Sequence, residues 1–265
     1  MSLNKLMHPR NKYRRPPDFQ ALAAKYPEFK KHTRRNRFGK ISYDFNDPNS
    51  LRVLTTTLLL EDFELNVEMP VDPQIPTIPL YMNYLLWIED LVAANPTSDV
   101  IRGVDIGCAA NCVYPLLAAK QFCWHMLATE ADTDSAFTAS SNVRKNKLGD
   151  RISVKVVEKG TMLQGVLESG TVYDFCMFNT LRYYAGSGDK CELMTLLTAL
   201  ILDSLKLKEQ VRVYTVKVAD KTVADTMVLT LEQAGVTRVS THQFCQGRTI
   251  RWGVAWTLGF AELAE

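Results

Sequence analysis

The sequence predicts an α/β protein in which helices cover both faces of a mostly parallel sheet. From residue 100 onward, short apolar runs alternate with longer stretches of helical periodicity, and this alternation is typical of a parallel sheet. The first of these apolar runs ends at Gly107, as expected for a strand that turns into a helix beside a ligand site. The 265 residues, 46% of them hydrophobic, are enough to bury one large core or two.

A formal net charge of only +2 hides a strong asymmetry along the chain. Residues 1–40 contain 12 basic and two acidic side chains, a net charge of +10, whereas the other 225 residues carry a net charge of −8. Such a basic segment is typical of contact with a polyanion, either nucleic acid or an anionic membrane. The alternative is a solvated tail. The aromatic side chains between the charges, Tyr13, Phe19, Tyr26, Phe29 and Phe38, favour a segment that packs on the protein.

The N-terminal part of the chain predicts a small helical module. A proline and an aspartate favour a helix over residues 17–29, in which apolar side chains recur at helical spacing. A short strand over 41–45 precedes a helix that Asn46-Asp47-Pro48 begins and that ends near Leu60. Four prolines within residues 70–79 predict an extended, stiff connector.

The rest of the chain predicts repeated strand and helix units. The expected strands are 101–107, 123–129, 152–157, 172–179 and 211–218, with a terminal hairpin of 236–244 and 250–258. The expected helices are 81–94, 109–120, 135–146, 192–205 and 222–234. We therefore expect two parts, a basic N-terminal module with its connector over 1–79 and an α/β domain over 80–265.

Several classes of protein are excluded by what the sequence lacks. No apolar run approaches the roughly 18 residues of a membrane span, and the start has no secretory signal, so we expect a soluble, intracellular protein. The six cysteines include no C-x-x-C pair, which favours free, buried thiols over a disulfide framework or zinc. The four histidines are isolated in the sequence, so no metal is expected.

The first strand and turn of the α/β domain indicate a nucleoside cofactor. Gly107 ends that strand, and Glu130, at the end of the next, is placed to bind ribose hydroxyls. The lack of G-x-G-x-x-G argues against a dinucleotide, and the lack of a P-loop argues against a nucleotidase. An α/β domain with an unused pocket is the alternative.

Several motifs together resemble the methyltransferase domain of the methyltransferase-like protein 16 family. They include Arg102-Gly103-Val104-Asp105-Ile106-Gly107, Tyr114-Pro115-Leu116-Leu117, Leu127-Ala128-Thr129-Glu130, Tyr173-Asp174-Phe175-Cys176-Met177 and Phe244-Cys245-Gln246-Gly247-Arg248-Thr249. The resemblance covers nearly the whole chain. It implies a Rossmann-like class I methyltransferase fold that uses S-adenosylmethionine to methylate the 6-amino group of an unpaired adenine in structured RNA. The family's substrates are U6 small nuclear RNA and hairpins of a messenger RNA, which places the protein in the nucleus or cytoplasm, with no membrane or DNA partner.

The resemblance also implies roles for individual residues. The cofactor positions are Asp105, Gly107, Glu130 and Thr161, and the RNA-binding positions are Arg10, Lys12, Arg14, Arg15, Arg182, Arg248 and Arg251. Two cofactor positions depart from the family pattern. Ala109 stands where the family has a second turn glycine, and Tyr81 stands where it has a cofactor-contacting arginine.

The catalytic motif departs furthest from the family. Asn179-Thr180-Leu181-Arg182 stands where the family has Asn-Pro-Pro-Phe, whose Asn side chain and Pro carbonyl hold the adenine amino group while the Phe stacks on the base. Without the prolines the backbone loses its fixed φ, and a displacement near one ångström costs roughly 100-fold in rate. Arg182 or Tyr183 could stack on the base instead.

A second departure lies close by, because residues 185–190 are short where the family has a long basic loop. The sequence therefore favours a pseudoenzyme of this class, which binds RNA and whose methyl transfer is weak or lost. The alternatives are an active adenine-N(6) methyltransferase with an unorthodox catalytic loop, and a methyltransferase redirected to another substrate.

Overall fold

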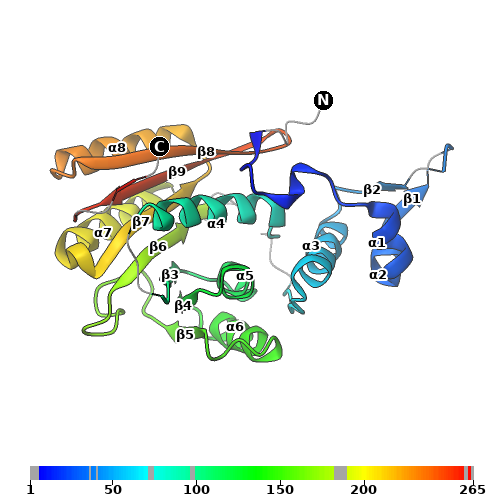
Figure 1. The fold of residues 1–265 in the computed structure, drawn as a ribbon, viewed down its shortest axis with the longest axis horizontal. Helices are drawn as coiled ribbons and strands as arrows, with labels where there is room; N and C mark the ends of the chain where they lie inside the picture. Colours follow the sequence, from blue (N-terminus) through cyan, green and yellow to red (C-terminus); the bar gives the residue numbers. More distant parts are fainter. Residues whose placement is uncertain are drawn as a thin grey trace.

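A seven-stranded sheet forms the centre of the protein, seen in a computed structural model that describes residues 6–35, 37–39, 41–70, 75–95, 99–181, 190–259 and 262–263 (Figure 1). The strands lie in the order β5-β4-β3-β6-β7-β9-β8. Their bounds are β3 (Arg102–Ile106), β4 (His125–Glu130), β5 (Ile152–Val156), β6 (Tyr173–Asn179), β7 (Val211–Val218), β8 (Arg238–Gln246) and β9 (Thr249–Thr257). The first five strands in that order are parallel to one another, and β9 is antiparallel to both of its neighbours, β7 and β8. The predicted α/β fold is confirmed.

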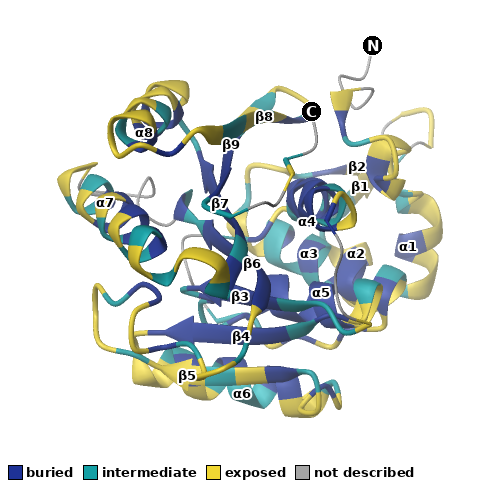
Figure 2. Cartoon of the chain, turned by 60° about the vertical axis from the view of Figure 1, so that its left-hand side comes forward, coloured by how far each residue is buried: buried dark blue, intermediate teal, exposed yellow. Residues whose placement is uncertain are grey.

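Helices cover both faces of this sheet (Figure 2). One face carries α4 (Ile78–Ala93), α5 (Val113–Phe122) and α6 (Thr133–Lys145), and the other carries α7 (Lys190–Leu207) and α8 (Lys221–Gln233). Because side chains alternate along each strand, β6 contributes Phe175 and Met177 to the first core and Cys176 and Phe178 to the second. The sheet is therefore buried on both faces, as its apolar strands require.

The N-terminal module consists of short helices and a small hairpin. Its elements are a 3-10 turn, η2 (Lys12–Arg14), followed by α1 (Phe19–Lys25), α2 (Pro27–Lys31), β1 (Thr33–Arg35), β2 (Ile41–Tyr43) and α3 (Pro48–Phe63). The expected single helix over 17–29 is wrong, because Tyr26 has extended backbone before Pro27 and separates α1 from α2. The expectation that the aromatic side chains pack is confirmed for Phe29, which is fully buried and stacks on Tyr43 at 4.7 Å. Phe38, in contrast, is exposed.

The module and the α/β domain share one hydrophobic core, which runs from Met7 and Phe29 to Leu85 and Leu117. Helix α4 begins at Ile78, so the last two residues of the expected connector are helical, while residues 71–74 lie outside the described part. The division of the chain at residues 79 and 80 stays a prediction.

Helix α5 begins four residues later than expected. Ala109 and Cys112 have positive φ angles of 57° and 51°, so residues 108–112 form a turn and not a first helical turn. The expected free thiols are confirmed, but Cys123 and Cys191 are exposed and the other four are buried. Among the described residues no helix is long and apolar enough to cross a membrane, and no group of acidic, cysteine or histidine side chains could hold a metal ion.

Candidate active site

Two adjoining cavities lie at the carboxyl ends of β3, β4 and β6. The larger, of about 570 Å³, is lined by Thr161 and Phe178 among others. The smaller, of about 100 Å³, is lined by residues of α4, α5 and the β3–α5 turn and by Asn179. Both include Gly107 and Glu130 in their walls. This position is where open α/β sheets bind ligands, and the larger volume falls within the usual range of about 300–1,000 Å³.

A third cavity, of about 940 Å³, lies at the opposite end of the sheet, beside residues 169–172 and Gln210. Its described lining contains none of the residues that the sequence indicates for cofactor or RNA. The chemistry at the carboxyl ends of the strands therefore identifies the site better than cavity size does.

Glu130 is held rigidly at the wall of both cavities. Its Oε2 accepts a hydrogen bond from the Ala109 N–H at 2.9 Å, and its Oε1 accepts from the N–H groups of Ala131 at 2.9 Å and Asp132 at 3.2 Å. Glu130 thus braces the turn after β3 and places its carboxylate in the wall of both cavities.

The turn after β3 keeps its shape although Ala109 replaces a glycine of the family pattern. Gly107 has a φ of 71° and Ala109 a φ of 57°, both in the left-handed region. For alanine this conformation costs roughly 1–2 kcal/mol, which the hydrogen bond from its N–H to Glu130 helps to offset. The substitution therefore adds local strain without closing the cavity.

Asn179 lies where the two adjoining cavities meet the end of β6. Its Oδ1 is buried and has no hydrogen-bond partner among the described residues. A buried acceptor left unpaired costs about 1–3 kcal/mol, so such an atom is typical of a position that a ligand completes. The sequence alone already indicates this residue through its motif.

Thr180 anchors the residue beside Asn179. Its side chain is fully buried, and its hydroxyl donates a hydrogen bond to the backbone carbonyl of Lys217 at 2.9 Å. Asn179 itself is paired with Lys217 across β6 and β7. These contacts fix the first half of the Asn179-Thr180-Leu181-Arg182 segment without proline. Arg182 and Tyr183, expected to stack on a base, lie outside the described residues, as do 185–189.

Of the other expected cofactor residues, one lines the site and one does not. Thr161 lies in the wall of the larger cavity. Asp105 is almost fully buried on β3 and does not appear in the described lining of either adjoining cavity. It lies below the site, where its charge acts on neighbouring side chains.

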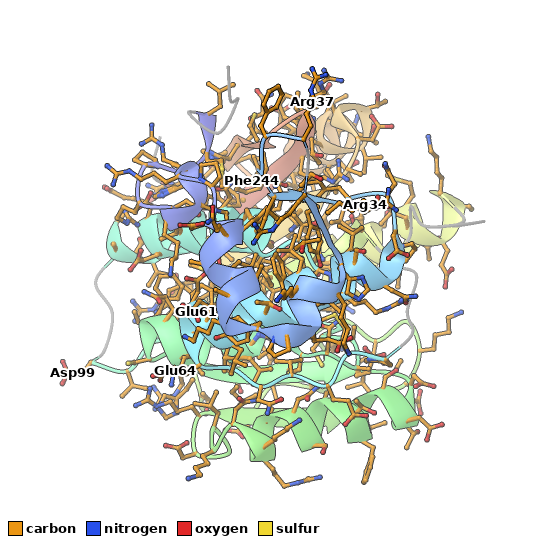
Figure 3. The ribbon with its side chains drawn as sticks, turned by 90° about the vertical axis from the view of Figure 1, so that its right-hand side faces the viewer. Arg34, Arg37, Glu61, Glu64, Asp99 and Phe244 are labelled. Carbon is orange, nitrogen blue, oxygen red and sulfur yellow. The ribbon has the colours of Figure 1, made fainter. Side chains whose placement is uncertain are left out.

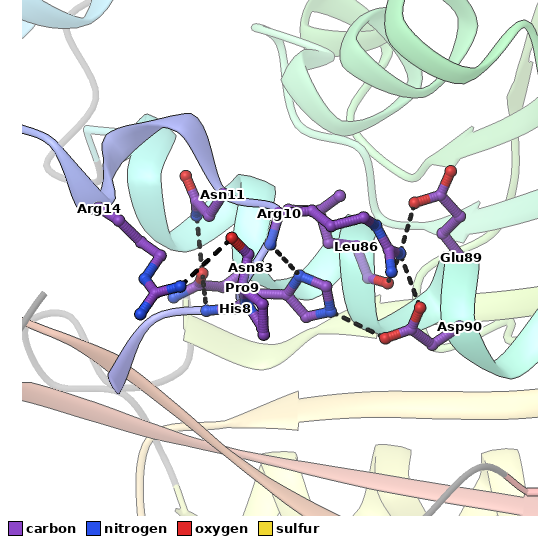
Figure 4. Close-up of polar contacts among 9 residues, drawn as sticks. All are labelled: His8, Pro9, Arg10, Asn11, Arg14, Asn83, Leu86, Glu89 and Asp90. Carbon is purple, nitrogen blue, oxygen red and sulfur yellow. Dashed lines mark hydrogen bonds and ion pairs between the residues drawn. The ribbon is translucent and has the colours of Figure 1, made fainter. Parts of the chain in front are cut away.

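The basic side chains at the start of the chain have different surroundings. Arg10 Nη2 lies 2.7 Å from Glu89 Oε2 and 2.6 Å from Asp90 Oδ1 on α4, and His8 Nε2 lies 2.8 Å from Asp90 Oδ2 (Figure 4). Lys12 pairs with Asp62 of α3. Arg14 and Arg15 are exposed. Arg10 and Lys12 therefore hold the segment to the acidic helices, and Arg14 and Arg15 present their charge to solvent.

Arg248 and Arg251 lie at the other end of the chain, around the β8–β9 turn. Gly247 makes this turn with a φ of 56°. Arg248 is exposed at the tip, whereas Arg251 is half-buried and donates from Nη1 to the Ile250 carbonyl at 2.7 Å. Arg251 also lies near enough to Lys217 to affect its ionisation. Arg251 thus lies near Lys217 but is absent from the described lining of both adjoining cavities, and Arg248 lies at the surface.

Lys217 is the main residue that sequence reasoning missed. It is fully buried and donates a hydrogen bond to the Tyr114 hydroxyl. Its side-chain nitrogen lies 4.9 Å, 5.2 Å and 5.0 Å from the ring centres of Tyr81, Tyr84 and Tyr114. Burial, reinforced by Arg251, holds the pKa of Lys217 well below its ordinary value. The available signal was a lysine inside the otherwise largely apolar strand Val211–Val218.

The side chain of Tyr81 forms part of the wall of the smaller cavity. Its ring stacks on that of Tyr114 with the ring centres 4.0 Å apart and the planes 11° from parallel. Both rings line the cavity. Where the family pattern has a positively charged side chain, this chain therefore has a tyrosine with a lysine behind it.

Comparisons with known proteins match nearly the whole chain. A family model described as RNA methyltransferase matches residues 1–193 and 183–260. The RNA N(6)-adenosine-methyltransferase mettl16 of Danio rerio is 40% identical over 286 residues, covering 97% of this chain and 60% of that protein. A U6 small nuclear RNA (adenine-(43)-N(6))-methyltransferase of Caenorhabditis elegans is 34% identical over 302 residues, covering 97% of this chain and 63% of that protein. The chain thus spans about 60% of the length of these relatives.

Solved structures agree with these relatives. The N-terminal domain of human METTL16 in complex with SAH superposes with a TM-score of 0.86 at 41% identity, covering 96% of this chain and 99% of that one. The human catalytic domain in complex with MAT2A 3'UTR hairpin 1 superposes with a TM-score of 0.86 at 38% identity, covering 96% of each chain. Because sequence and fold agree over nearly its whole length, the chain belongs to the METTL16 family of RNA methyltransferases and has their Rossmann-like methyltransferase fold.

Proposed function

We propose that the protein transfers a methyl group from S-adenosylmethionine to the 6-amino group of an unpaired adenine in structured RNA, of the U6 small nuclear RNA or messenger RNA hairpin type. The observation that carries this proposal is the buried, unpartnered Oδ1 of Asn179 at the junction of β6 and the two adjoining cavities. An amide oxygen in this position is suited to accept a hydrogen bond from an adenine amino group.

The two adjoining cavities fit the cofactor. The larger one has room for an adenosine, with Glu130 to accept from the ribose hydroxyls and Thr161 and Met162 in the wall. The smaller one, beside the turn of residues 107–111, has room for the aminoacyl end. When bound, S-adenosylmethionine supplies an electrophilic methyl group on its sulfonium. No metal is needed for that chemistry.

The residues of the chain then position the acceptor. In the proposed complex Asn179 Oδ1 accepts one N–H of the adenine amino group, which turns the nitrogen lone pair toward the methyl group. The hydrogen bond from Thr180 to Lys217 limits the movement of Asn179 during this step. After transfer, the methylated nitrogen loses a proton to solvent. The protein thus acts by orientation and not by acid–base chemistry.

The RNA is proposed to bind along the basic N-terminal module and the β8–β9 turn. Arg34 lies in the β1–β2 hairpin, and Arg37 follows β1. Figure 3 shows Arg37 well away from the acidic residues Glu61 and Glu64 of the α3 region. Arg248 extends from the other turn. Guanidinium groups bind phosphates through paired hydrogen bonds, which suits both surfaces. We propose that residues 1–79 contact RNA, residues 80–265 carry the chemistry, and the protein acts in the nucleus or cytoplasm.

A second candidate is an RNA-binding protein with weak or lost methyl transfer. The replacement of Pro-Pro-Phe by Thr180-Leu181-Arg182 favours it. The relatives described above are methyltransferases and give it no support, and the buried anchor of Thr180 holds the residue next to Asn179 in place. We therefore place the active enzyme first.

One experiment separates the two candidates. Calorimetry with S-adenosylhomocysteine is followed, on the same sample, by transfer of a labelled methyl group to a hairpin with one unpaired adenine. We expect cofactor binding and methyl transfer, with N179A losing transfer by at least about 100-fold while still binding cofactor. A hairpin with guanine in place of that adenine is the control substrate. RNA binding without transfer would establish the second candidate.

A further inference from the structure

Lys217 is a buried cation without an acidic partner in contact. It is fully buried on β7, and no carboxylate forms a salt bridge with it within the described part of the chain. Its polar contact is the hydroxyl of Tyr114, and the rings of Tyr81 and Tyr84 surround the rest of the ammonium group. Aromatic faces stabilise a cation only partly, and an unpaired buried charge is costly. A ligand that brings a negative charge close to Lys217 would stabilise its charged form.

Lys217 lies one side chain behind the wall of the smaller cavity. Tyr81 and Tyr114 line that cavity, and Lys217 donates its hydrogen bond to Tyr114. Asn179, in the same wall, is its neighbour across the two strands. The Tyr114 hydroxyl can accept from the lysine and donate its own hydrogen to a group in the cavity. One hydrogen bond therefore connects Lys217 to a residue of the cavity wall, and a ligand that accepts from Tyr114 would add a second.

Among the described residues of its wall, the smaller cavity has no positive side chain for an anion. The described residues of its wall are Tyr81, Gly107, Cys108, Ala109, Ala110, Asn111, Tyr114, Glu130, Ser135 and Asn179. The charged side chain among them is the acidic Glu130. The aminoacyl end of the cofactor, which the preceding proposal places here, carries a carboxylate that needs positive charge. Lys217 is in position to provide it.

Two charged side chains and three tyrosines on other elements face Lys217. Asp105 on β3 raises its pKa and Arg251 on β9 lowers it, and the Tyr84 hydroxyl of α4 shares a hydrogen bond of 2.8 Å with Thr215. Burial has the largest effect and holds the pKa of Lys217 well below its ordinary value. A carboxylate in the cavity would favour the charged amine and raise that pKa again.

We propose that Lys217, acting through the hydroxyl of Tyr114, is the positive partner of the cofactor carboxylate and takes up a proton when that carboxylate binds. The inference rests on the proposed function, because it assumes a cofactor with an aminoacyl end in the smaller cavity. It makes Lys217 a positioning residue that selects for the carboxylate, and it gives the partly buried Tyr81 and the buried Tyr114 a role in cofactor binding.

Calorimetry with two ligands tests this proposal directly. S-adenosylhomocysteine and its decarboxylated analogue share the adenosine, the thioether and the amine and differ in the carboxylate. At pH 8, titrations in buffers of different ionisation enthalpy count the protons taken up. We expect wild-type protein to take up more protons with S-adenosylhomocysteine than with the analogue. In K217M we expect that difference to vanish and the affinity for S-adenosylhomocysteine to fall about tenfold, with the analogue unaffected.

The possible outcomes distinguish a failure of this inference from a failure of the proposed function on which it rests. Equal proton uptake with both ligands in wild-type protein overturns the inference, and that result needs no variant to fold. Y114F keeps the lysine and removes the hydroxyl, so it should lose affinity for S-adenosylhomocysteine alone. Equal loss for both ligands in K217M and Y114F would mean a structural role and would overturn it. Failure of wild-type protein to bind either ligand would overturn the proposed function itself.

Discussion

The side-chain amides of Asn11 and Asn83 are joined by a buried hydrogen bond, in which Asn11 Nδ2 donates to Asn83 Oδ1 at 2.7 Å. Asn83 Nδ2 in turn donates to the backbone carbonyl of Cys245 at 3.0 Å. One amide on α4 thus connects the first residues of the chain to β8. The whole arrangement is buried, since Asn83 is 1% exposed and Asn11 is 3% exposed.

Replacement of Asn83 by alanine should destabilise the protein by about 2–3 kcal/mol, because it removes the acceptor for the His8 N–H and for one Asn11 amide hydrogen, and the donor to the Cys245 carbonyl. Urea unfolding measures this as a lower midpoint with an unchanged slope. N46A removes the same side chain from an exposed position and should change the free energy of unfolding by less than about 0.5 kcal/mol. Equal effects of N83A and N46A would contradict this account.

Replacement of Thr180 by valine keeps the shape of the side chain and removes its hydroxyl. Without the hydrogen bond to Lys217 the catalytic segment gains freedom, so the rate of methyl transfer should fall about tenfold while cofactor affinity stays unchanged. Single-turnover transfer and calorimetry measure the two quantities. T195V makes the same change at an exposed position of α7 and should leave both alone. A normal rate in T180V would show that this anchor does not position Asn179.

Arg248 tests the proposed RNA surface at the β8–β9 turn. R248A should weaken binding of a hairpin, and the slope of log affinity against log salt should become less steep by about 1 if the side chain neutralises one phosphate. R238A removes an arginine at the far end of the same hairpin and should leave the salt dependence unchanged. An affinity for RNA that does not vary with salt in wild-type protein would exclude phosphate contacts as the main source of binding.

His242 predicts how stability depends on pH. Burial, reinforced by the charge of His8, lowers its pKa below the ordinary value, and its ring stacks on Trp87 with centres 5.5 Å apart. The folded protein therefore prefers the neutral ring. Its stabilising contribution is complete above the ordinary pKa of about 6.5 and decreases as the pH falls through that value toward the lower folded pKa.

H242Q should remove this dependence. The free energy of unfolding of wild-type protein should fall between pH 7.5 and pH 5.5 by more than that of H242Q, with a slope difference of up to about 1.4 kcal/mol per pH unit. Urea unfolding at the two pH values gives the comparison. Parallel pH dependences in the two proteins would show that His242 titrates alike in the folded and unfolded states.

Much of the fold and part of the site follow from local sequence. Gly107 and Glu130 end neighbouring parallel strands, so their meeting at one edge of the sheet can be predicted without a structure. The late start of α5 cannot, because no residue type in 108–112 demands the left-handed angles of Ala109 and Cys112. The break at Pro27 was visible in the sequence, but the apolar spacing on both sides of it favoured one continuous helix.

Lys217 shows why the remainder could not be predicted. In the sequence it is one lysine in a strand, and a lysine in a strand usually points to solvent. Its burial depends on tyrosines that α4 and α5 bring from more than 100 residues away, as the contact with Tyr114 shows. Likewise, the role of Arg10 depends on Glu89 and Asp90 of α4. The charge pattern of the sequence identifies a basic segment, and the fold shows which of its basic side chains are paired with acidic ones.

The bridge through Asn83 also constrains the order in which a growing chain can complete its structure. Residues 8–14 are synthesised before their partners, because the contacts His8–Asp90 and Asn11–Asn83 require α4 and Asn83 is fully bonded only after Cys245 has been made. Lys12 can pair with Asp62 of α3 earlier. The buried amide contacts of this segment therefore form only after β8 has been synthesised.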